Sequence, residues 1–186
     1  MRSKLKLVIS FAVLIFFVDH ITKWWIVDSL AIGDRMPIIN GFFDIVHGRN
    51  TGAAFGLLSD WNSPYRDWFF YAVGILALIF LYYYIKSVKS SDRLILVSLA
   101  MILGGACGNI FDRILRGSVV DFLSVHYYYK VWSFEIFNYQ IRIPLEWPAF
   151  NVADAAITTA VLILVVQQLK GIRQEIAAAK EKKSEG

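Results

Sequence analysis

Four apolar runs constrain this chain more than any other feature, because each is close to the length that crosses a bilayer. A helix rises about 1.5 Å per residue and needs about 20 apolar residues to cross about 30 Å of hydrocarbon. The runs occupy residues 7–27, 68–85, 94–111 and 152–169. The sequence is also 57% hydrophobic and only 18% charged, unlike a soluble domain. We therefore expect a mainly α membrane protein with four transmembrane helices.

The N-terminus has features of a secretory signal peptide, because the basic segment MRSKLK precedes an apolar run. This run continues through Trp24 and Trp25 without a small-x-small cleavage motif. Its length fits a spanning helix better than the apolar core of a signal peptide. We expect the segment to be retained as the first span.

Positively charged residues predict the orientation, since cytoplasmic segments carry an excess of Lys and Arg. They lie before the first run, between the second and third, and after the fourth: Arg2, Lys4, Lys6, Lys86, Lys89, Arg93, Lys170, Arg173, Lys180, Lys182 and Lys183. Both termini, including the tail 171–186, are then cytoplasmic, and the connections 28–67 and 112–151 lie outside. This placement of the net charge of +4 favours membrane orientation over nucleic-acid binding.

Both outer connections have patterns typical of short strands. In the first, turn residues such as Pro37 and the pair Asn40-Gly41 separate short aromatic and β-branched runs. In the second, VVDFLSV and the aromatic stretch that follows also favour strands. We expect a small extracytoplasmic β-sheet built from both connections, within a single domain that covers residues 1–186. The tail after Gly171 is expected to be a solvated helix or disordered.

Two carboxylates are expected to meet at the outer membrane boundary. Asp121 follows the third run and Asp154 lies at the start of the fourth, so the topology places both on the same side. Two adjacent carboxylates cannot both ionise cheaply, so one can act as general base while the other keeps a proton. A structural alternative exists for Asp154, because Asn151 and Asp154 have the spacing of a helix capping box. Asp121 alone could be a surface residue at a strand end.

Further polar residues surround the end of the third run. Gly104 and Gly108 would allow another helix to approach closely, and a helix would present Asn109, Asp112 and Arg113 near the membrane edge. Arg113 could pair with Asp112 or with lipid phosphate.

Polar residues also occur in and after the first run. Asp19 and Lys23 have the spacing of a helical ion pair, for which a structural role is favoured. Asn50 in NTGAAFG is a turn residue by default, with Gly52 providing backbone freedom, although its amide could hold a peptide backbone.

Metal and cofactor chemistry is not expected. The three histidines, His20, His47 and His126, form no HExxH motif, and Cys107 is the single cysteine. The motifs of a serine hydrolase elbow are also missing from the sequence. We therefore predict neither a metal site nor a cofactor.

Function classes other than an enzyme remain open from the residues alone. A small proton-coupled transporter could use Asp19, Asp121 and Asp154 as a relay. The second run has no charged residue, however, which disfavours a relay through the membrane. A non-catalytic membrane subunit that binds a partner through its outer sheet is the third class.

The motifs together resemble the lipoprotein signal peptidase (signal peptidase II) family across the chain from the first run to Leu169. The matching blocks are DHITKWW, NTGAAFG, GGACGNIFDRILRGSVVDF and FNVADAAI. The resemblance implies an aspartic endopeptidase of the bacterial inner membrane that removes the signal peptide of diacylglyceryl-modified prolipoproteins just before the lipidated cysteine. It also implies the inhibitors globomycin and myxovirescin. One stretch, 125–147, is longer than the usual connection of the family.

The resemblance also implies roles for individual residues. Asp121 and Asp154 match the catalytic dyad of the family. The positions that support the dyad or contact the substrate correspond to Asp19, Lys23, Asn50, Gly52, Asn109, Asp112, Arg113 and Asn151.

Overall fold

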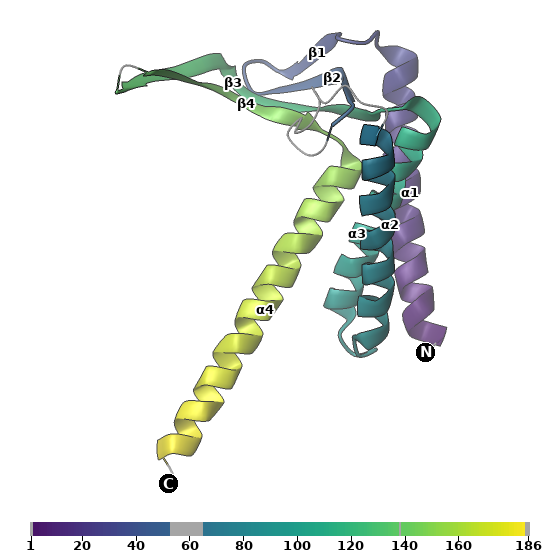
Figure 1. Cartoon of the computed structure of the whole chain (residues 1–186), viewed down its shortest axis with the longest axis vertical. Coiled ribbons are helices and arrows are strands. Elements are labelled where there is room, and N and C mark those ends of the chain that lie inside the picture. Colours follow the sequence, from purple (N-terminus) through teal and green to yellow (C-terminus); the bar gives the residue numbers. More distant parts are fainter. Residues whose placement is uncertain (1, 53–64, 138, 185–186) are drawn as a thin grey trace.

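The chain forms four long helices with a small sheet at one end of them, as Figure 1 shows. The computed structural model describes residues 2–52, 65–137 and 139–184. In chain order the elements are α1 (Arg2–Ser29), β1 (Arg35–Ile39), β2 (Phe43–Asn50), α2 (Tyr65–Ser87), α3 (Arg93–Arg116), β3 (Val119–Ile136), β4 (Tyr139–Phe150) and α4 (Val152–Ser184). Each helix contains a stretch long and apolar enough to cross a membrane: Ser3–Ser29, Trp68–Ser87, Arg93–Arg116 and Val152–Lys180. The expected fold class is confirmed.

The sheet is antiparallel, with the strand order β1-β2-β3-β4. Its first two strands come from the first connection and its last two from the second, as predicted. Irregular register interrupts each strand pair, and the largest irregularity lies in β3 between His126 and Val131. The buried side chains of Val120 and Phe122 pack with Ile26 of α1, which holds β3 against the end of the helices.

Glycines allow α3 to approach two other helices closely. A Cβ atom on Gly104 would lie 2.4 Å from the carbonyl oxygen of Ala12 in α1. A Cβ on Gly105 would lie 2.8 Å from the carbonyl oxygen of Ala153 in α4. A Cβ on Gly108 would lie 2.6 Å from a carboxylate oxygen of Asp19. The predicted close approach at Gly104 and Gly108 is therefore correct, and α3 is the helix on which the others are assembled.

Two short connections between the sheet and the helices, from α3 to β3 and from β4 to α4, bring polar residues close together. Gly117 ends α3 in the left-handed conformation (φ 68°), and its N–H donates to the carbonyl of Arg113 at 2.9 Å. The chain then enters β3 at once, so Asp121 lies close to the end of α3. At the other strand, β4 leads through Asn151 directly into α4.

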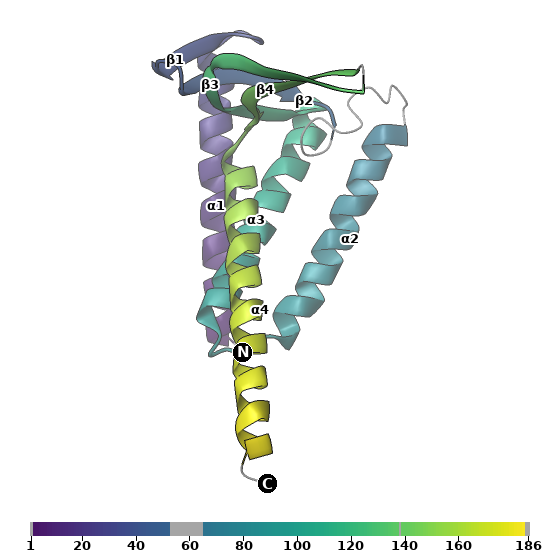
Figure 2. The same ribbon diagram turned by 90° about the vertical axis from the view of Figure 1, so that its left-hand side faces the viewer.

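The C-terminal tail is helical, since α4 continues to Ser184. Figures 1 and 2 both show α4 extending beyond the ends of the other helices. The sequence predicts either a solvated helix or disorder for this tail, and the structure shows the helix. Large apolar side chains such as Phe17, Leu76 and Leu162 are exposed on the helices, as expected for surfaces that contact lipid.

Candidate active site

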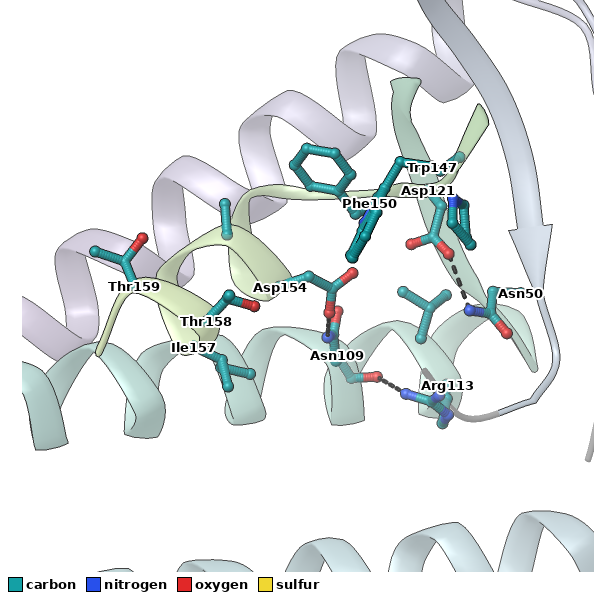
Figure 3. A pocket seen from close by; sticks show the side chains of 14 residues that line it. Asn50, Asn109, Arg113, Asp121, Trp147, Phe150, Asp154, Ile157, Thr158 and Thr159 are labelled. Carbon is teal, nitrogen blue, oxygen red and sulfur yellow. Dashed lines mark hydrogen bonds between the residues drawn. The ribbon is translucent and has the colours of Figure 1, made fainter. Parts of the chain in front are cut away.

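A cavity of about 530 Å³ lies between the sheet and the ends of α3 and α4. Figure 3 shows the side chains of Asp121 and Asp154 together in this cavity. Polar residues of α3 and apolar residues of β4 and α4 complete the wall, so that the full lining is Asn50, Asn109, Arg113, Val119, Asp121, Trp147, Pro148, Ala149, Phe150, Asp154, Ala155, Ile157, Thr158 and Thr159. The expectation that topology brings the two carboxylates to one place agrees with this arrangement.

Asp154 lies in the first turn of α4 and takes part in the predicted capping box. The Asn151 side chain accepts the N–H of Asp154 at 2.9 Å, and the Asp154 side chain accepts the N–H of Asn151 at 3.3 Å. The positive end of the helix dipole favours a negative charge here. The other oxygen of the Asp154 carboxylate accepts a hydrogen bond from the Asn109 side chain in the cavity. The capping role of Asp154 therefore does not exclude a catalytic role.

Asp121 is only 5% exposed, so the structural alternative of a surface residue at a strand end is wrong. Its carboxylate accepts hydrogen bonds from Asn50 at 3.0 Å and from Asn151 at 2.8 Å. Burial, and then the charge of Asp154, raise the pKa of Asp121 to about 6. Of this pair, Asp121 is thus a carboxyl group that retains its proton at a pH where a solvated aspartate would be ionised.

Two amides connect the carboxylates. Asn151 donates from one side-chain nitrogen to Asp121 Oδ1 at 2.8 Å and to Asn109 Oδ1 at 3.3 Å. Asn109 in turn donates to Asp154 Oδ1 at 2.8 Å. The result is a continuous hydrogen-bonded path from Asp121 through Asn151 and Asn109 to Asp154. Such a path holds the two carboxyl groups in fixed positions, because each accepts a hydrogen bond from a neutral amide.

Lys23 is the buried cation of the site. Its ammonium lies 2.8 Å from Asp19, 3.3 Å from Asp112 and 2.8 Å from the side-chain oxygen of Asn109. The side chains of Lys23, Asp19 and Asp112 are fully buried. The expected pair of Asp19 and Lys23 is therefore present, but it is part of a larger network. A buried ammonium with three acceptors has a partner for every proton.

Asp19 and Asp112 also hold the backbone of the site. Asp19 accepts the N–H of Ala153 at 2.9 Å, and Asp112 accepts the N–H of Val120 at 3.0 Å. Each donor is adjacent in the chain to one of the two cavity carboxylates, because Ala153 precedes Asp154 and Val120 precedes Asp121. The buried charges of α1 and α3 thereby fix the start of α4 and the start of β3.

Arg113 does not pair with Asp112, contrary to one sequence-based alternative; the arginine that pairs with Asp112 is Arg116. Arg113 donates to the carbonyl of Gly52 at 2.8 Å and to that of Asn109 at 3.2 Å. The N–H of Gly52 donates to the Asn50 side chain at 3.0 Å. Asn50 thus makes the expected turn and also contacts Asp121, and its binding of a substrate backbone stays a prediction.

A second polar cluster, which sequence reasoning missed, lies in the sheet and consists of Arg35, Asp44, Ser124, His126, Tyr129 and Glu146. Arg35 donates to Asp44 at 2.9 Å and to Glu146 at 2.8 Å. Burial opposes the charge of Asp44, but hydrogen bonds from Tyr129 and Arg35 prevail and lower its pKa. These partners are separated by up to 111 positions in the chain, which is why no local spacing reveals them.

Among the described residues, no group of three or more His, Cys, Asp or Glu side chains has an arrangement that could hold a metal ion. A metal-free mechanism stays a prediction that needs a solution experiment. The cavity offers two carboxylates, amide donors and a guanidinium, which are groups suited to proton transfer and to binding a peptide backbone.

Comparisons with known proteins cover most of the chain. The family model for Signal peptidase (SPase) II matches residues 11–170, a range that includes every residue lining the cavity. The lipoprotein signal peptidase of Syntrophotalea carbinolica is 37% identical over 174 residues, which are 93% of this chain and 98% of that protein.

Two solved structures, each described as a bacterial membrane enzyme, are similar to the whole fold. The first has a TM-score of 0.70 at 33% identity, and the aligned part covers 88% of this chain and 87% of the chain in that structure. The second also has a TM-score of 0.70, at 30% identity, and the aligned part covers 88% of this chain and 92% of the chain in that structure. The similarity therefore extends to helices and sheet together.

Proposed function

Since the chain belongs to the signal peptidase II family, we propose that Asp121 and Asp154 are the catalytic pair of an aspartic endopeptidase. Membership of this family shows that this multi-pass membrane protein is a peptidase with a signal peptidase II function. Neither the comparisons nor any contact among the described residues supports the proton-coupled transporter. The observation that carries the aspartic assignment is the path of amides that joins Asp121 to Asp154 in one cavity.

The proposed reaction divides the acid and base roles between the two carboxylates. Asp154, at the positive end of α4, begins ionised and takes a proton from a water molecule. The water oxygen adds to the scissile carbonyl carbon. Asp121, whose pKa is raised to about 6, begins protonated and donates to the amide nitrogen as the C–N bond breaks. The shared proton belongs to the pair, and its return from Asp154 to Asp121 restores the starting state.

Substrate binding is assigned to the walls beside the pair. Asn50, Gly52 and Arg113 form a connected polar group on one side, where the Asn50 amide offers donors and an acceptor to a peptide backbone. Trp147, Phe150 and Ile157 are apolar and line the same cavity. A precursor with a diacylglyceryl group could place its scissile bond at the carboxylates and its lipid against these apolar residues.

The cellular setting follows from the same proposal. We infer a bacterial inner membrane location with both termini in the cytoplasm and the cavity at the outer face, because the positive residues cluster at the opposite helix ends. We also expect globomycin and myxovirescin to compete for the cavity that the precursor occupies.

One experiment tests this function as a whole. Purified protein in lipid is incubated with one prolipoprotein, with and without its diacylglyceryl group, and the products are mapped by mass spectrometry. Each buried methylene contributes about 0.8 kcal/mol, so the lipidated precursor should be cut far faster, just before the lipidated cysteine. EDTA should leave the rate unchanged. Equal cleavage of both precursors would reject lipid recognition, and inactivation by EDTA that zinc reverses would reject the metal-free mechanism.

A further inference from the structure

The hairpin of β3 and β4 extends beyond the rest of the sheet and has one apolar row on β4. Residues at alternate positions of a strand point to the same face. Trp147 lines the candidate active site, and the residues that share its face along β4 are Leu145, Ile143, Ile141 and Tyr139. The intervening residues Glu146, Pro144, Arg142 and Gln140 point to the opposite face, which is polar except at Pro144. One face of β4 is therefore apolar from the cavity to the far end of the hairpin.

The partner strand continues the same pattern. Directly opposed residues in an antiparallel pair point to the same face. Three apolar residues of β3 oppose three of β4, in the pairs Trp132–Ile143, Phe134–Ile141 and Ile136–Tyr139. The pairs between them, Ser133–Arg142 and Glu135–Gln140, are polar. Residues 131–136 and 139–143 therefore form a two-stranded ribbon with one wholly apolar face, which we call the amphipathic ribbon.

Most of the apolar face of the amphipathic ribbon is exposed, and Phe134 and Ile141 are half-buried. Trp132 is 61% exposed, Tyr139 77% and Ile143 41%. An isolated two-stranded hairpin is only marginally stable in water, and soluble proteins rarely expose such contiguous apolar surface. This surface consequently requires an apolar neighbour in the native environment.

The position of the ribbon identifies that neighbour. The cavity lies between the sheet and the ends of α3 and α4, so the face that carries Trp147 is the one directed toward the helices. Figure 1 shows the hairpin running sideways from the helices, at the end where β4 continues into α4. A ribbon placed there, beside four helices long and apolar enough to span a membrane, has the position and direction needed to lie on a bilayer surface with its apolar face inward.

The base of the ribbon is held by polar contacts that set this direction. Arg35 of β1 binds Glu146 at 2.8 Å on the polar face. The irregular segment of β3 before Val131 is anchored by Tyr128, whose N–H donates to the carbonyl of Gly41 at 2.8 Å. Both anchors connect the hairpin to the first half of the sheet. The ribbon therefore leaves the sheet in a defined direction.

We propose that the amphipathic ribbon is an interfacial membrane-binding element that inserts Trp132, Phe134 and Ile143 into the lipid surface beside the active-site cavity. The occupant of the apolar face is phospholipid, because the face continues the lipid-contacting surface of the protein. Residues 131–143 carry one acidic and one basic residue, Glu135 and Arg142, so their formal charges cancel. Attachment should then depend on apolar burial and remain when salt is added.

Spin-label accessibility tests the proposal in the intact protein. Cys107, the single cysteine, is replaced by Cys107→Ala, and labels are attached to Phe134→Cys and Ile143→Cys on the apolar face. The matched controls are the opposed pair Ser133→Cys and Arg142→Cys on the polar face. Each variant is measured in phosphatidylcholine nanodiscs that contain one copy of the protein, with oxygen as the lipid-soluble relaxation reagent and a neutral nickel chelate as the water-soluble one.

The expected result is opposite accessibility on the two faces. The labels at 134 and 143 should respond to oxygen and lose their response to nickel, at low and at high salt, while the control labels respond to nickel. If all four labels respond to nickel, the ribbon stands clear of the bilayer and the proposal is wrong. If the apolar-face labels are shielded from both reagents, protein covers them, and the proposal is also wrong. Neither failure bears on the carboxylate pair, because no readout uses cleavage.

Discussion

At the scale of single residues, the site depends on how buried charges are neutralised. Lys23 meets Asp19, Asp112 and the amide oxygen of Asn109, so the cation and its acceptors are mutually satisfied. Removing one member of a buried ion pair lowers stability by more than the pair itself contributes, because the remaining charge is buried without a partner. The network is therefore a rigid support on which the Asn109 amide, and through it Asp154, is oriented.

Asn109 is expected to be a positioning residue whose loss lowers turnover more than substrate binding. Asn109→Ala removes the donor to Asp154 and an acceptor of Lys23. Displacement of a catalytic group by about 1 Å can cost about 10²-fold in rate, so we expect kcat to fall about a hundredfold with a smaller change in KM. The control is Asn40→Ala, at an exposed turn. A wild-type kcat for Asn109→Ala would show that the amide path has no part in catalysis.

Asp121 should make the stability of the protein depend on pH. Burial and the charge of Asp154 raise its pKa from 3.8 to about 6. The folded protein then binds this proton more tightly than the unfolded chain, so the stabilisation is complete below about pH 4 and is lost as the pH rises through about 6. The shift corresponds to about 3 kcal/mol.

Thermal unfolding in detergent at pH 4, 6 and 8 measures this effect. Asp121→Asn should lose the part of the pH dependence between pH 4 and 7, whereas Asp28→Asn, at an exposed position, should keep it. An unchanged pH profile in Asp121→Asn would mean that the carboxyl group titrates normally in the folded protein.

Local spacing in the sequence predicted some of these residues and could not predict others. Asp19 and Lys23 were recognisable because they are four positions apart on one helix, and Asn151 with Asp154 because they have the spacing of a capping box. The contacts of Asn109 with Lys23 and Asp154 span 86 and 45 positions. Such contacts depend on how helices pack, which no local pattern contains.

At the scale of elements, close packing of α3 against α1 depends on glycine. A Cβ atom at position 104 would lie 2.4 Å from the backbone oxygen of Ala12, which cannot move without displacing α1. We expect Gly104→Ala to destabilise the folded protein by about 1–3 kcal/mol, the usual cost of overpacking. The measurement is the midpoint of thermal unfolding.

The matched control for this prediction is Gly171→Ala, because a Cβ at position 171 meets no atom within 4 Å. Alanine favours helix over glycine by about 0.5–1 kcal/mol, so this variant should be equal to wild type or slightly more stable. Equal stability of Gly104→Ala and wild type would show that α1 and α3 are not closely packed there.

The strands illustrate the limit of prediction at this scale. Alternation and turn residues predicted strands in both connections, and the four-stranded sheet confirms them. The irregular register between His126 and Val131 was not predicted. It depends on tertiary anchors, such as Tyr128 against Gly41 and Tyr129 against Asp44, that join segments distant in sequence.

At the scale of the whole molecule, the proposed orientation determines on which side of the membrane the cavity lies. Reporter fusions at Lys89 and after Lys183 should report the cytoplasm, and a fusion at Lys130 in the hairpin should report the outside, because the basic residues cluster at the helix ends opposite the sheet. Two reporters are used at each position, one active only in the cytoplasm and one active only outside, so that each is the control for the other. A cytoplasmic signal at Lys130 would put the cavity on the side where no exported precursor arrives.

The central claim is that Asp121 and Asp154 carry out the cleavage together. The most direct measurement is the single-turnover rate at which Asp121→Asn and Asp154→Asn cut one lipidated precursor, compared with Asp28→Asn and with thermal unfolding of each variant. Because an amide cannot cycle a proton, each cavity variant should fold and bind but lose about 10³-fold or more in rate, while Asp28→Asn cuts at the wild-type rate. A folded Asp121→Asn or Asp154→Asn variant that cleaves near the wild-type rate would contradict the account.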